Sequence, residues 1–269
     1  MLDALRGVRW SARRPVAPSA PGSHRSRRHG IALEFTEYRP YRQGDDPRRL
    51  DWKLLARTDR AYVRLTDDHT VLPTAIVIDA SASMAYPAAT LGKWRLASAL
   101  AVGFAAVAQA SGDPVGLTIV SGEHVVGEVA RTTRRGIVAT IARLLHRTTP
   151  GPAASKGSRL VPAGRVRHVI ISDFLQDAVP VLPEHAEVYA VHVVAREEID
   201  PPRGAWLVSD PEDDSVRRPL LNETRAAYLD AFGAWREAIR QQWRTAGASF
   251  ALVETDESPE RAVRRVVRE

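Results

Sequence analysis

Cysteine is absent from the 269 residues of this chain. That absence excludes disulfide bonds and thiolate zinc sites and suits a reducing compartment. Long apolar runs are missing as well, since the longest, residues 96–110, is shorter than the roughly 20 residues that a membrane span needs. The N-terminus, MLDALRGVRWSARRP, lacks the continuous apolar region of a secretory signal. These absences predict a cytoplasmic protein without a membrane span.

Several catalytic signatures are also missing. No Walker A or Gly-rich dinucleotide loop follows a strand, so we predict no nucleotide site there. The Gly-x-Ser-x-Gly elbow of α/β hydrolases is absent, and the eight histidines lack the paired spacing of a zinc site. An aspartyl phosphotransferase would need an acid two residues after Asp79, where Ser81 stands. Nothing in these patterns predicts a nucleophile.

Basic residues are concentrated at the N-terminus. Residues 1–60 hold 14 of the 38 Lys and Arg residues but only 7 of the 32 Asp and Glu residues, so the net charge of +6 is an N-terminal feature. Such a basic segment can contact nucleic acid or anionic lipid. Because few aromatic residues are interleaved with the charges, we favour a solvated, flexible leader over residues 1–29.

Two further regions follow the leader. Residues 30–70 read as a strand, a short helix and a strand, with Asp46 before Pro47 as the expected helix start. From residue 71 strands and helices alternate to residue 269, apart from a polar insertion at about 196–221 that can form a small hairpin. This succession predicts an α/β domain with a doubly wound, mostly parallel sheet and helices on both faces.

Two of the buried strands end in polar residues. The stretch AIVIDASASM, residues 75–84, closes on Asp79, Ser81 and Ser83, and IISDF ends in Asp173. In an open parallel sheet, ligands bind beyond the carboxyl ends of the strands, so neighbouring strands would bring these oxygens to one crevice. An all-oxygen set suits a hard cation such as Mg²⁺. The alternative is a helix N-cap cluster, in which the same groups accept from free N–H groups.

The D-x-S-x-S pattern, with an Asp at the end of a later strand, resembles the metal-ion-dependent adhesion site of von Willebrand factor type A domains. By that resemblance Ser81 and Ser83 ligate the ion through their hydroxyls, while Asp79 and Asp173 hold it directly or through water. The family's middle motif supplies a threonine. Its nearest counterpart here is Ser158 in the shortened stretch GSRL, which implies weaker binding.

The segment GIALEFTEYRPYRQGDDPRRLDWKLLARTDRAYVR resembles the signature of the bacterial family called domain of unknown function fifty-eight. In that family the signature precedes a von Willebrand type A-like domain. Its members commonly accompany MoxR-type AAA+ ATPases, which implies a non-enzymatic adaptor that engages such an ATPase, or another partner presenting an acidic side chain. The signature's charged residues can equally be structural, as a tight turn, a helix cap and ion pairs.

Two other function classes stay open on the sequence. A metal-dependent phosphoester hydrolase would use the same acids to hold an ion that activates water. A nucleic-acid-binding protein would depend on the basic leader and would bind with a steep salt dependence.

Overall fold

The computed structural model describes residues 1–12, 21–29, 35–43, 45, 47–151, 166–175, 179–183, 186–213 and 215–268. Over 21–29, 35–37, 49 and 64–70 it describes the backbone only. The chain forms two compact units. The sheet unit comprises Met1–Trp10 and Pro73–Glu269, and the signature unit comprises Ser11–Leu72.

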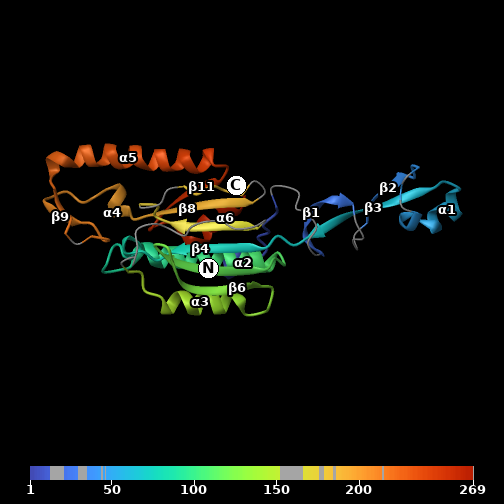
Figure 1. The fold of residues 1–269 in the computed structure, drawn as a ribbon, viewed down its shortest axis with the longest axis horizontal. Helices are drawn as coiled ribbons and strands as arrows, with labels where there is room; N and C mark the ends of the chain where they lie inside the picture. The colour runs from blue at the N-terminus through green and yellow to red at the C-terminus, as the bar shows by residue number, and fades with distance from the viewer. Residues whose placement is uncertain are drawn as a thin grey trace. The chain divides into compact units, whose positions relative to one another are not determined.

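The sheet unit is built on six strands in the order β11-β8-β7-β4-β5-β6 (Figure 1). Each pair of neighbouring strands is parallel, except the pair of β5 and the edge strand β6, which is antiparallel. The central strands β7 and β8 are buried along their whole length, as parallel strands covered on both faces are. The α/β class and the mostly parallel sheet predicted from the sequence are therefore confirmed. The strands are β4 (Thr74–Asp79), β5 (Val115–Ser121), β6 (His124–Thr132), β7 (Arg167–Ser172), β8 (Glu187–Val194) and β11 (Ser249–Glu254).

Helices cover both faces of this sheet, on opposite sides in Figure 1. On one face α2 (Gly92–Ala110), α3 (Ile137–Arg147) and α6 (Pro259–Arg268) bury their apolar residues in the larger core. On the other face α5 (Asn222–Thr245) inserts Ile239 and Trp243 into a second core. Among the described residues, none of the helices combines the length and apolar character that crossing a bilayer requires.

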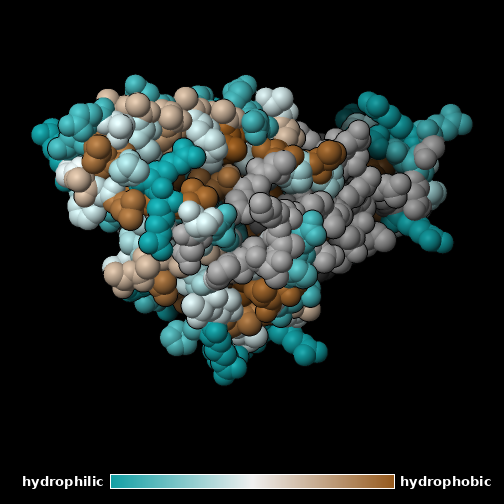
Figure 2. Space-filling view, turned by 60° about the vertical axis from the view of Figure 1, so that its left-hand side comes forward, coloured by the Kyte–Doolittle hydropathy of each residue, from teal (hydrophilic) through white to brown (hydrophobic). Residues whose placement is uncertain are grey.

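The insertion between β8 and β11 contains short elements. It begins with α4 (Arg196–Ile199) and continues into an antiparallel hairpin of β9 (Trp206–Ser209) and β10 (Arg217–Leu220). The predicted small hairpin is thus present. Figure 2, turned so that the side of α4 and β9 comes forward, shows hydrophobic residues in separate patches among hydrophilic ones.

The signature unit holds a three-stranded antiparallel sheet in the order β1-β3-β2. Its elements are β1 (Pro21–His29), β2 (Phe35–Pro40), the 3₁₀ turn η2 (Pro47–Arg49), α1 (Trp52–Thr58) and β3 (Tyr62–Thr70). The predicted strand, helix and strand are present, but the α-helix begins at Trp52 instead of Pro47. The reason is local: Asp51 caps it by accepting from the N–H groups of Lys53 and Leu54, both at 3.0 Å. The predicted cap, Asp46, lies outside the described residues.

The N-terminal residues differ from the predicted leader of residues 1–29. The first ten belong to the sheet unit, where η1 (Asp3–Leu5) precedes a buried Trp10 that is 1% exposed. Residues 21–29 form β1, which pairs with β3. Leu5 and Trp10 join the larger core, and the apolar area that they bury offsets the cost of ordering the segment.

Candidate functional site

The candidate site lies where the sheet reverses its direction of winding. After β4 the chain adds β5 on one side, then returns to place β7 on the other side of β4. Because β4 and β7 are adjacent and parallel, their carboxyl ends meet at one edge of the sheet. Asp79 is the last residue of β4, and Asp173 directly follows β7. The predicted neighbourhood of the two strands is therefore present.

Asp79 joins the two strand ends through hydrogen bonds. Its Oδ1 accepts from the N–H of Ser81 at 2.8 Å, and its Oδ2 accepts from the hydroxyl of Ser172 at 2.8 Å. The same Ser172 hydroxyl accepts from the N–H of Phe174 at 2.9 Å. Asp79 is 7% exposed, so these bonds satisfy a carboxylate that is nearly buried. They also hold the loop after β4 against the loop after β7.

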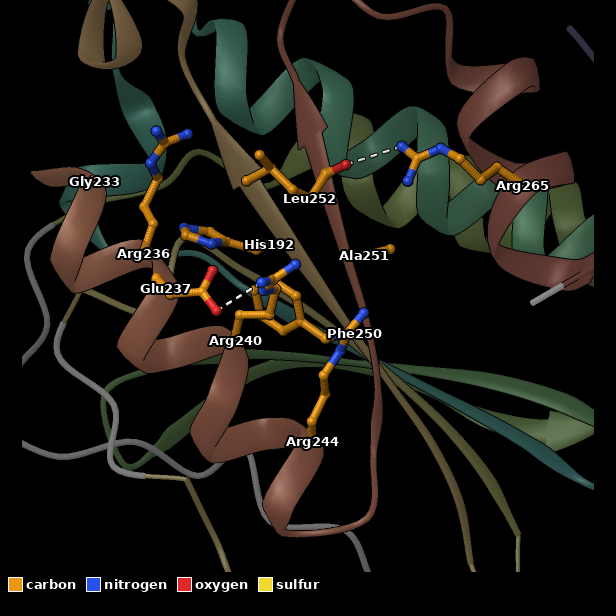
Figure 3. Close-up of a pocket in the computed structure, with 10 residues that line it drawn as sticks. All are labelled: His192, Gly233, Arg236, Glu237, Arg240, Arg244, Phe250, Ala251, Leu252 and Arg265. Carbon is orange, nitrogen blue, oxygen red and sulfur yellow. Dashed lines mark hydrogen bonds and ion pairs between the residues drawn. The ribbon is translucent and has the colours of Figure 1, made fainter.

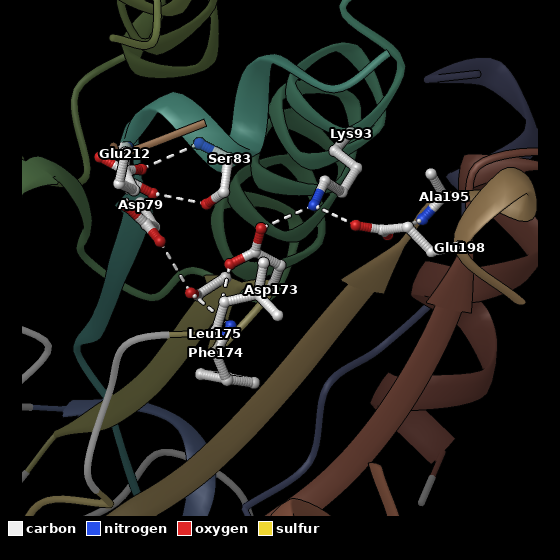
Figure 4. A network of polar contacts seen from close by, with 11 residues as sticks. Asp79, Ser83, Lys93, Asp173, Phe174, Leu175, Ala195, Glu198 and Glu212 are labelled. Atoms are coloured by element: carbon white, nitrogen blue, oxygen red, sulfur yellow. Dashed lines mark hydrogen bonds and ion pairs between the residues drawn. The ribbon is translucent and has the colours of Figure 1, made fainter. Parts of the chain in front are cut away.

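Ser81 and Ser83 place two hydroxyls side by side. Their Oγ atoms lie 3.1 Å apart at the start of the short turn η3 (Ala82–Ala85), which Ser81 directly precedes, and both residues are buried. Neither hydroxyl caps α2, whose N-cap is Leu91 without a side-chain bond. The N-cap interpretation therefore does not hold for α2, although Asp79 does satisfy the N–H of Ser81. From the β9–β10 hairpin, Glu212 brings a carboxylate to this turn, where its Oε1 accepts from the N–H of Ser83 at 2.9 Å (Figure 4).

A buried lysine lies beside this group of residues. Lys93, in the first turn of α2, is fully buried, and its ammonium donates to Asp173 Oδ2 at 2.7 Å and to Glu198 Oε1 at 2.9 Å. A positive charge in the first turn of a helix opposes the helix dipole. The two carboxylates supply the compensation that burial and the dipole both require. Figure 4 shows Lys93 between Asp173 and Glu198, and Asp79 beside Ser83.

Burial and pairing act in opposite directions on these groups. Burial lowers the pKa of Lys93, but the charges of Asp173 and Glu198 outweigh it, so the pKa of Lys93 is raised. Burial raises the pKa of Glu198 more than its bond to Lys93 lowers it. Lys93 is shared between two acids, and Asp79 and Glu212 add two more carboxylates nearby. Among the described residues, four carboxylates thus lie at or near the site together with one ammonium, and such an acid-rich setting favours a cation.

The structure brings Asp79, Ser81 and Ser83 together at one edge with Asp173, while Ser158 lies outside the described residues. Among the described residues, no three His, Cys, Asp or Glu side chains form a group that could hold a metal ion. Within the described residues, an ion here would therefore need oxygens other than carboxylates, such as the hydroxyls of Ser81 and Ser83. Both oxygens of Asp173 already accept, from Lys93 and from the N–H of Leu175, which suits a role through water.

Four residues of this site were not predicted: Lys93, Ser172, Glu198 and Glu212. Ser172 stands directly before Asp173 in IISDF, so its position was a usable signal. Lys93 was also visible as one of only three lysines, placed at the start of an apolar helix. The two glutamates carry no local signal, because they reach the site from the polar insertion.

In the signature unit, the charged residues have local structural roles. Arg39 forms an ion pair with Asp45 at 2.7 Å, and the hydrogen bond from Arg39 is the main cause that lowers the pKa of Asp45. Asp51 caps α1 and accepts from the hydroxyl of Tyr38 at 2.8 Å. Trp52, by contrast, is 64% exposed. The turn, cap and ion-pair interpretation thus fits Asp45 and Asp51, and Gly44 lies outside the described residues.

The fold and this cluster define an open α/β protein with a polar, acid-rich site at the point where its sheet reverses. The chain belongs to the family described as Protein of unknown function DUF58, whose sequence model matches residues 37–238. It is similar to the uncharacterized proteins Rv1480 of Mycobacterium tuberculosis and Mb1516 of Mycobacterium bovis. Each is 29% identical over 271 residues, covering 95% of this chain and 85% of the relative.

Proposed function

We propose that this protein is a non-enzymatic interaction module that binds Mg²⁺, or another divalent ion, and uses it to hold an acidic side chain of a partner. Ser81 and Ser83 would ligate the ion through their hydroxyls. Asp79 and Asp173 would act through water, because hydrogen bonds already engage both oxygens of each. The ion would supply the positive charge that attracts the partner's carboxylate.

The observation that carries this proposal is the position of Glu212. A carboxylate from a separate segment, 129 residues away in the chain, approaches the Asp79–Ser83 loop and accepts from the N–H of Ser83. The loop can therefore receive an acid at the place where an acidic partner would enter. We infer that Glu212 is a resident substitute for the partner's side chain.

The fold supports the same interpretation. A von Willebrand type A-like domain has its adhesion site at the carboxyl end of a mostly parallel sheet, and the Asp79 cluster occupies that edge here. The hairpin that carries Glu212 also exposes the hydrophobic side chains of Trp206, Leu207 and Val208, by 49, 66 and 47%. Exposed apolar side chains grouped on one element are typical of a protein-binding surface.

The proposed partner is a MoxR-type AAA+ ATPase, in the cytoplasm. This part of the proposal depends on membership of the DUF58 family, whose members the sequence resemblance associates with such ATPases. The acid that engages the ion would be an exposed Asp or Glu of the ATPase.

Calorimetric titration with Mg²⁺ tests the metal site. The double variant Ser81→Ala/Ser83→Ala should bind Mg²⁺ at least about 100-fold more weakly than wild type, since it loses both direct ligands, and loss of even one outer-shell partner costs about 10- to 100-fold. Asp79→Ala should weaken binding as well. The control Asp230→Ala removes an exposed acid on α5 and should leave binding unchanged. Equal binding by all four proteins would contradict the metal site.

A pull-down with a MoxR-type ATPase from the same genome tests the partner. Capture should require Mg²⁺, disappear with a chelator, and fail for Ser81→Ala/Ser83→Ala. Capture that ignores both the chelator and the variant would refute the role of the ion. A parallel screen with phosphate-ester and oligonucleotide substrates should show no Mg²⁺-dependent turnover, and turnover that Asp79→Ala abolishes would replace this proposal with a hydrolase.

A further inference from the structure

A concave region lies at the free edge of the sheet, beside β11. It is a pocket of about 320 Å³ between α5 and the edge strand β11, and α6 contributes Arg265 to it (Figure 3). Its volume is at the lower end of the range of about 300–1,000 Å³ for small-molecule sites. Its lining is dominated by four arginines and contains one acid, Glu237.

The arginines follow a helical spacing. Arg236, Arg240 and Arg244 are four residues apart on α5, so they lie along one side of the helix, as Figure 3 shows. They directly follow the partly buried Trp235 and the buried Ile239 and Trp243 of the same helix. This stripe therefore lies at the border between the buried and the exposed faces of α5.

Two of the four arginines have ion-pair partners. Arg240 pairs with Glu237 at 2.6 Å, and Arg265 pairs with Glu257 at 2.9 Å while donating to the carbonyl of Leu252 at 2.9 Å. Within the part of the chain that the structure describes, neither Arg236 nor Arg244 has a carboxylate at ion-pair distance. Within that part of the chain, the pocket thus presents two guanidinium groups without a carboxylate partner, of which Arg236 lies over the ring of Phe232, and two that neighbouring acids hold in place.

Unpartnered polar atoms also border the pocket. His192, from β8, is 1% exposed, and its Nδ1 has no hydrogen-bond partner within the described residues. The same is true of the buried Nε of Arg236. Leaving a buried polar atom without a hydrogen bond is costly, so such atoms are uncommon in native structures. His192 and Arg236 therefore bring two unsatisfied polar atoms to the arginine-rich lining of this pocket.

We propose that this pocket binds the phosphoryl group of a small phosphate ester. Guanidinium groups match the oxygens of a phosphoryl group in pairs, which favours phosphate over an ordinary single-point anion. Phe250 lines the same pocket and offers an apolar wall to the organic part of the ester. His192 and Arg236 lie within the family match, which ends at residue 238, whereas Arg240, Arg244 and Arg265 follow it.

Calorimetry with AMP, ribose 5-phosphate and adenosine tests the site on the full chain at low salt. Both phosphate esters should bind, and adenosine should not. The double variant Arg236→Gln/Arg244→Gln should bind AMP at least about tenfold more weakly. The control Arg217→Gln/Arg218→Gln removes two exposed arginines of β10 and should bind as wild type does.

Three results would overturn the proposal. They are absence of binding by both esters, equal binding of AMP and adenosine, and equal AMP affinity of the two double variants. Arg244 is exposed, so the single variant Arg244→Gln should fold and provides a second test, with AMP binding at least a few-fold weaker. The ring nitrogen signals of His192 in a ¹⁵N spectrum should shift on addition of AMP, and unchanged signals at saturation would also count against this pocket.

Discussion

Strand β7 has a fully buried cation at each end. At its start, Arg167 pairs with Asp113 at 3.3 Å and with Glu187 at 3.4 Å. Just beyond its end, Lys93 of α2 pairs with Asp173 at 2.7 Å and with Glu198 at 2.9 Å. Each cation therefore faces two carboxylates, and composition alone does not distinguish the two clusters.

Their surroundings do distinguish them. The guanidinium of Arg167 lies 4.2 Å from the ring centre of Trp10 and donates to the carbonyl of Trp10 at 3.3 Å, so the indole closes this end. The Lys93 end has hydroxyls, a partly exposed Glu198 and the approaching Glu212. A buried ion pair is thus weak evidence of function by itself. Better evidence of function comes from the end of the strand at which the ion pair lies and from the polar groups around it.

Breaking the Arg167 cluster should have the largest effect on stability. Arg167→Ala removes the buried cation that Asp113 and Glu187 share and should lower the free energy of unfolding by about 3–5 kcal/mol. Urea denaturation followed by circular dichroism measures this, and Mg²⁺ binding by the folded variant should stay as in wild type. The control Arg135→Ala, at an exposed position, should change stability by less than about 0.5 kcal/mol. A loss below about 1 kcal/mol for Arg167→Ala would mean that this end is not structural.

Removing the indole that closes the same end should cost nearly as much. Trp10 contacts Phe104 and Tyr189 as well as Arg167, so Trp10→Ala should destabilise the protein by about 3–4 kcal/mol. Trp52→Ala is the matched control, because that side chain is 64% exposed. Thermal denaturation compares the two variants. Equal melting temperatures would contradict a structural role for the first ten residues.

Trp10 also shows where reading the sequence falls short. The predicted leader was defined by its basic residues, and a single Trp within RGVRWSARRP gives no periodic pattern. Its burial depends on Arg167, 157 residues further along the chain. The central strands were predictable for the opposite reason, since β4, β7 and β8 are buried on both faces and read as continuous apolar runs.

The same contrast applies to the candidate site. Asp79, Ser81, Ser83 and Asp173 were predictable because each ends or follows an apolar strand, and parallel strands end at one edge. Lys93 and Glu198 are 105 residues apart, and Ser83 and Glu212 are 129 apart. No local pattern encodes such pairs. They arise because the insertion folds back over the strand ends, which only the tertiary structure reveals.

Replacing Lys93, the cation at the other end of β7, should distinguish the two clusters by its effects on stability and on Mg²⁺ affinity. Lys93→Met leaves Asp173 and Glu198 unpaired, but Glu198 is partly exposed, so we expect a loss of about 2–3 kcal/mol, less than for Arg167→Ala. The added negative charge should tighten Mg²⁺ binding, whereas Arg167→Ala should not. Calorimetry and urea denaturation measure both quantities, with Lys93→Arg retaining the charge as control. Unchanged Mg²⁺ affinity in Lys93→Met would show that the charge of this lysine does not affect binding of the ion.

Lowering the pH should destabilise the protein because it favours protonation of His192, which contacts the end of β7 near Asp173. Burial lowers the pKa of His192 from 6.5 to about 4. The unfolded chain therefore binds the proton more readily, and the stability that His192 contributes above pH 6.5 is lost as pH falls toward 4. Between pH 7.5 and 5 the loss should be about 2 kcal/mol. Urea denaturation of His192→Phe should show a correspondingly smaller loss over that range, and parallel pH profiles for the two proteins would contradict this assignment.

The smallest effect on stability, and the most direct test of the open end, concerns Glu212. Glu212→Gln keeps a hydrogen-bond acceptor for the N–H of Ser83 but removes the negative charge, so stability should change by less than about 0.5 kcal/mol. If the carboxylate competes with a partner's acid, the variant should bind a MoxR-type ATPase about three- to tenfold more tightly. Surface plasmon resonance measures this, with the exposed Glu223→Gln on α5 as control. Weaker binding by Glu212→Gln would instead make Glu212 part of the surface that holds the partner. The difference between the two ends of β7 would then depend on the hydroxyls of Ser81 and Ser83 alone.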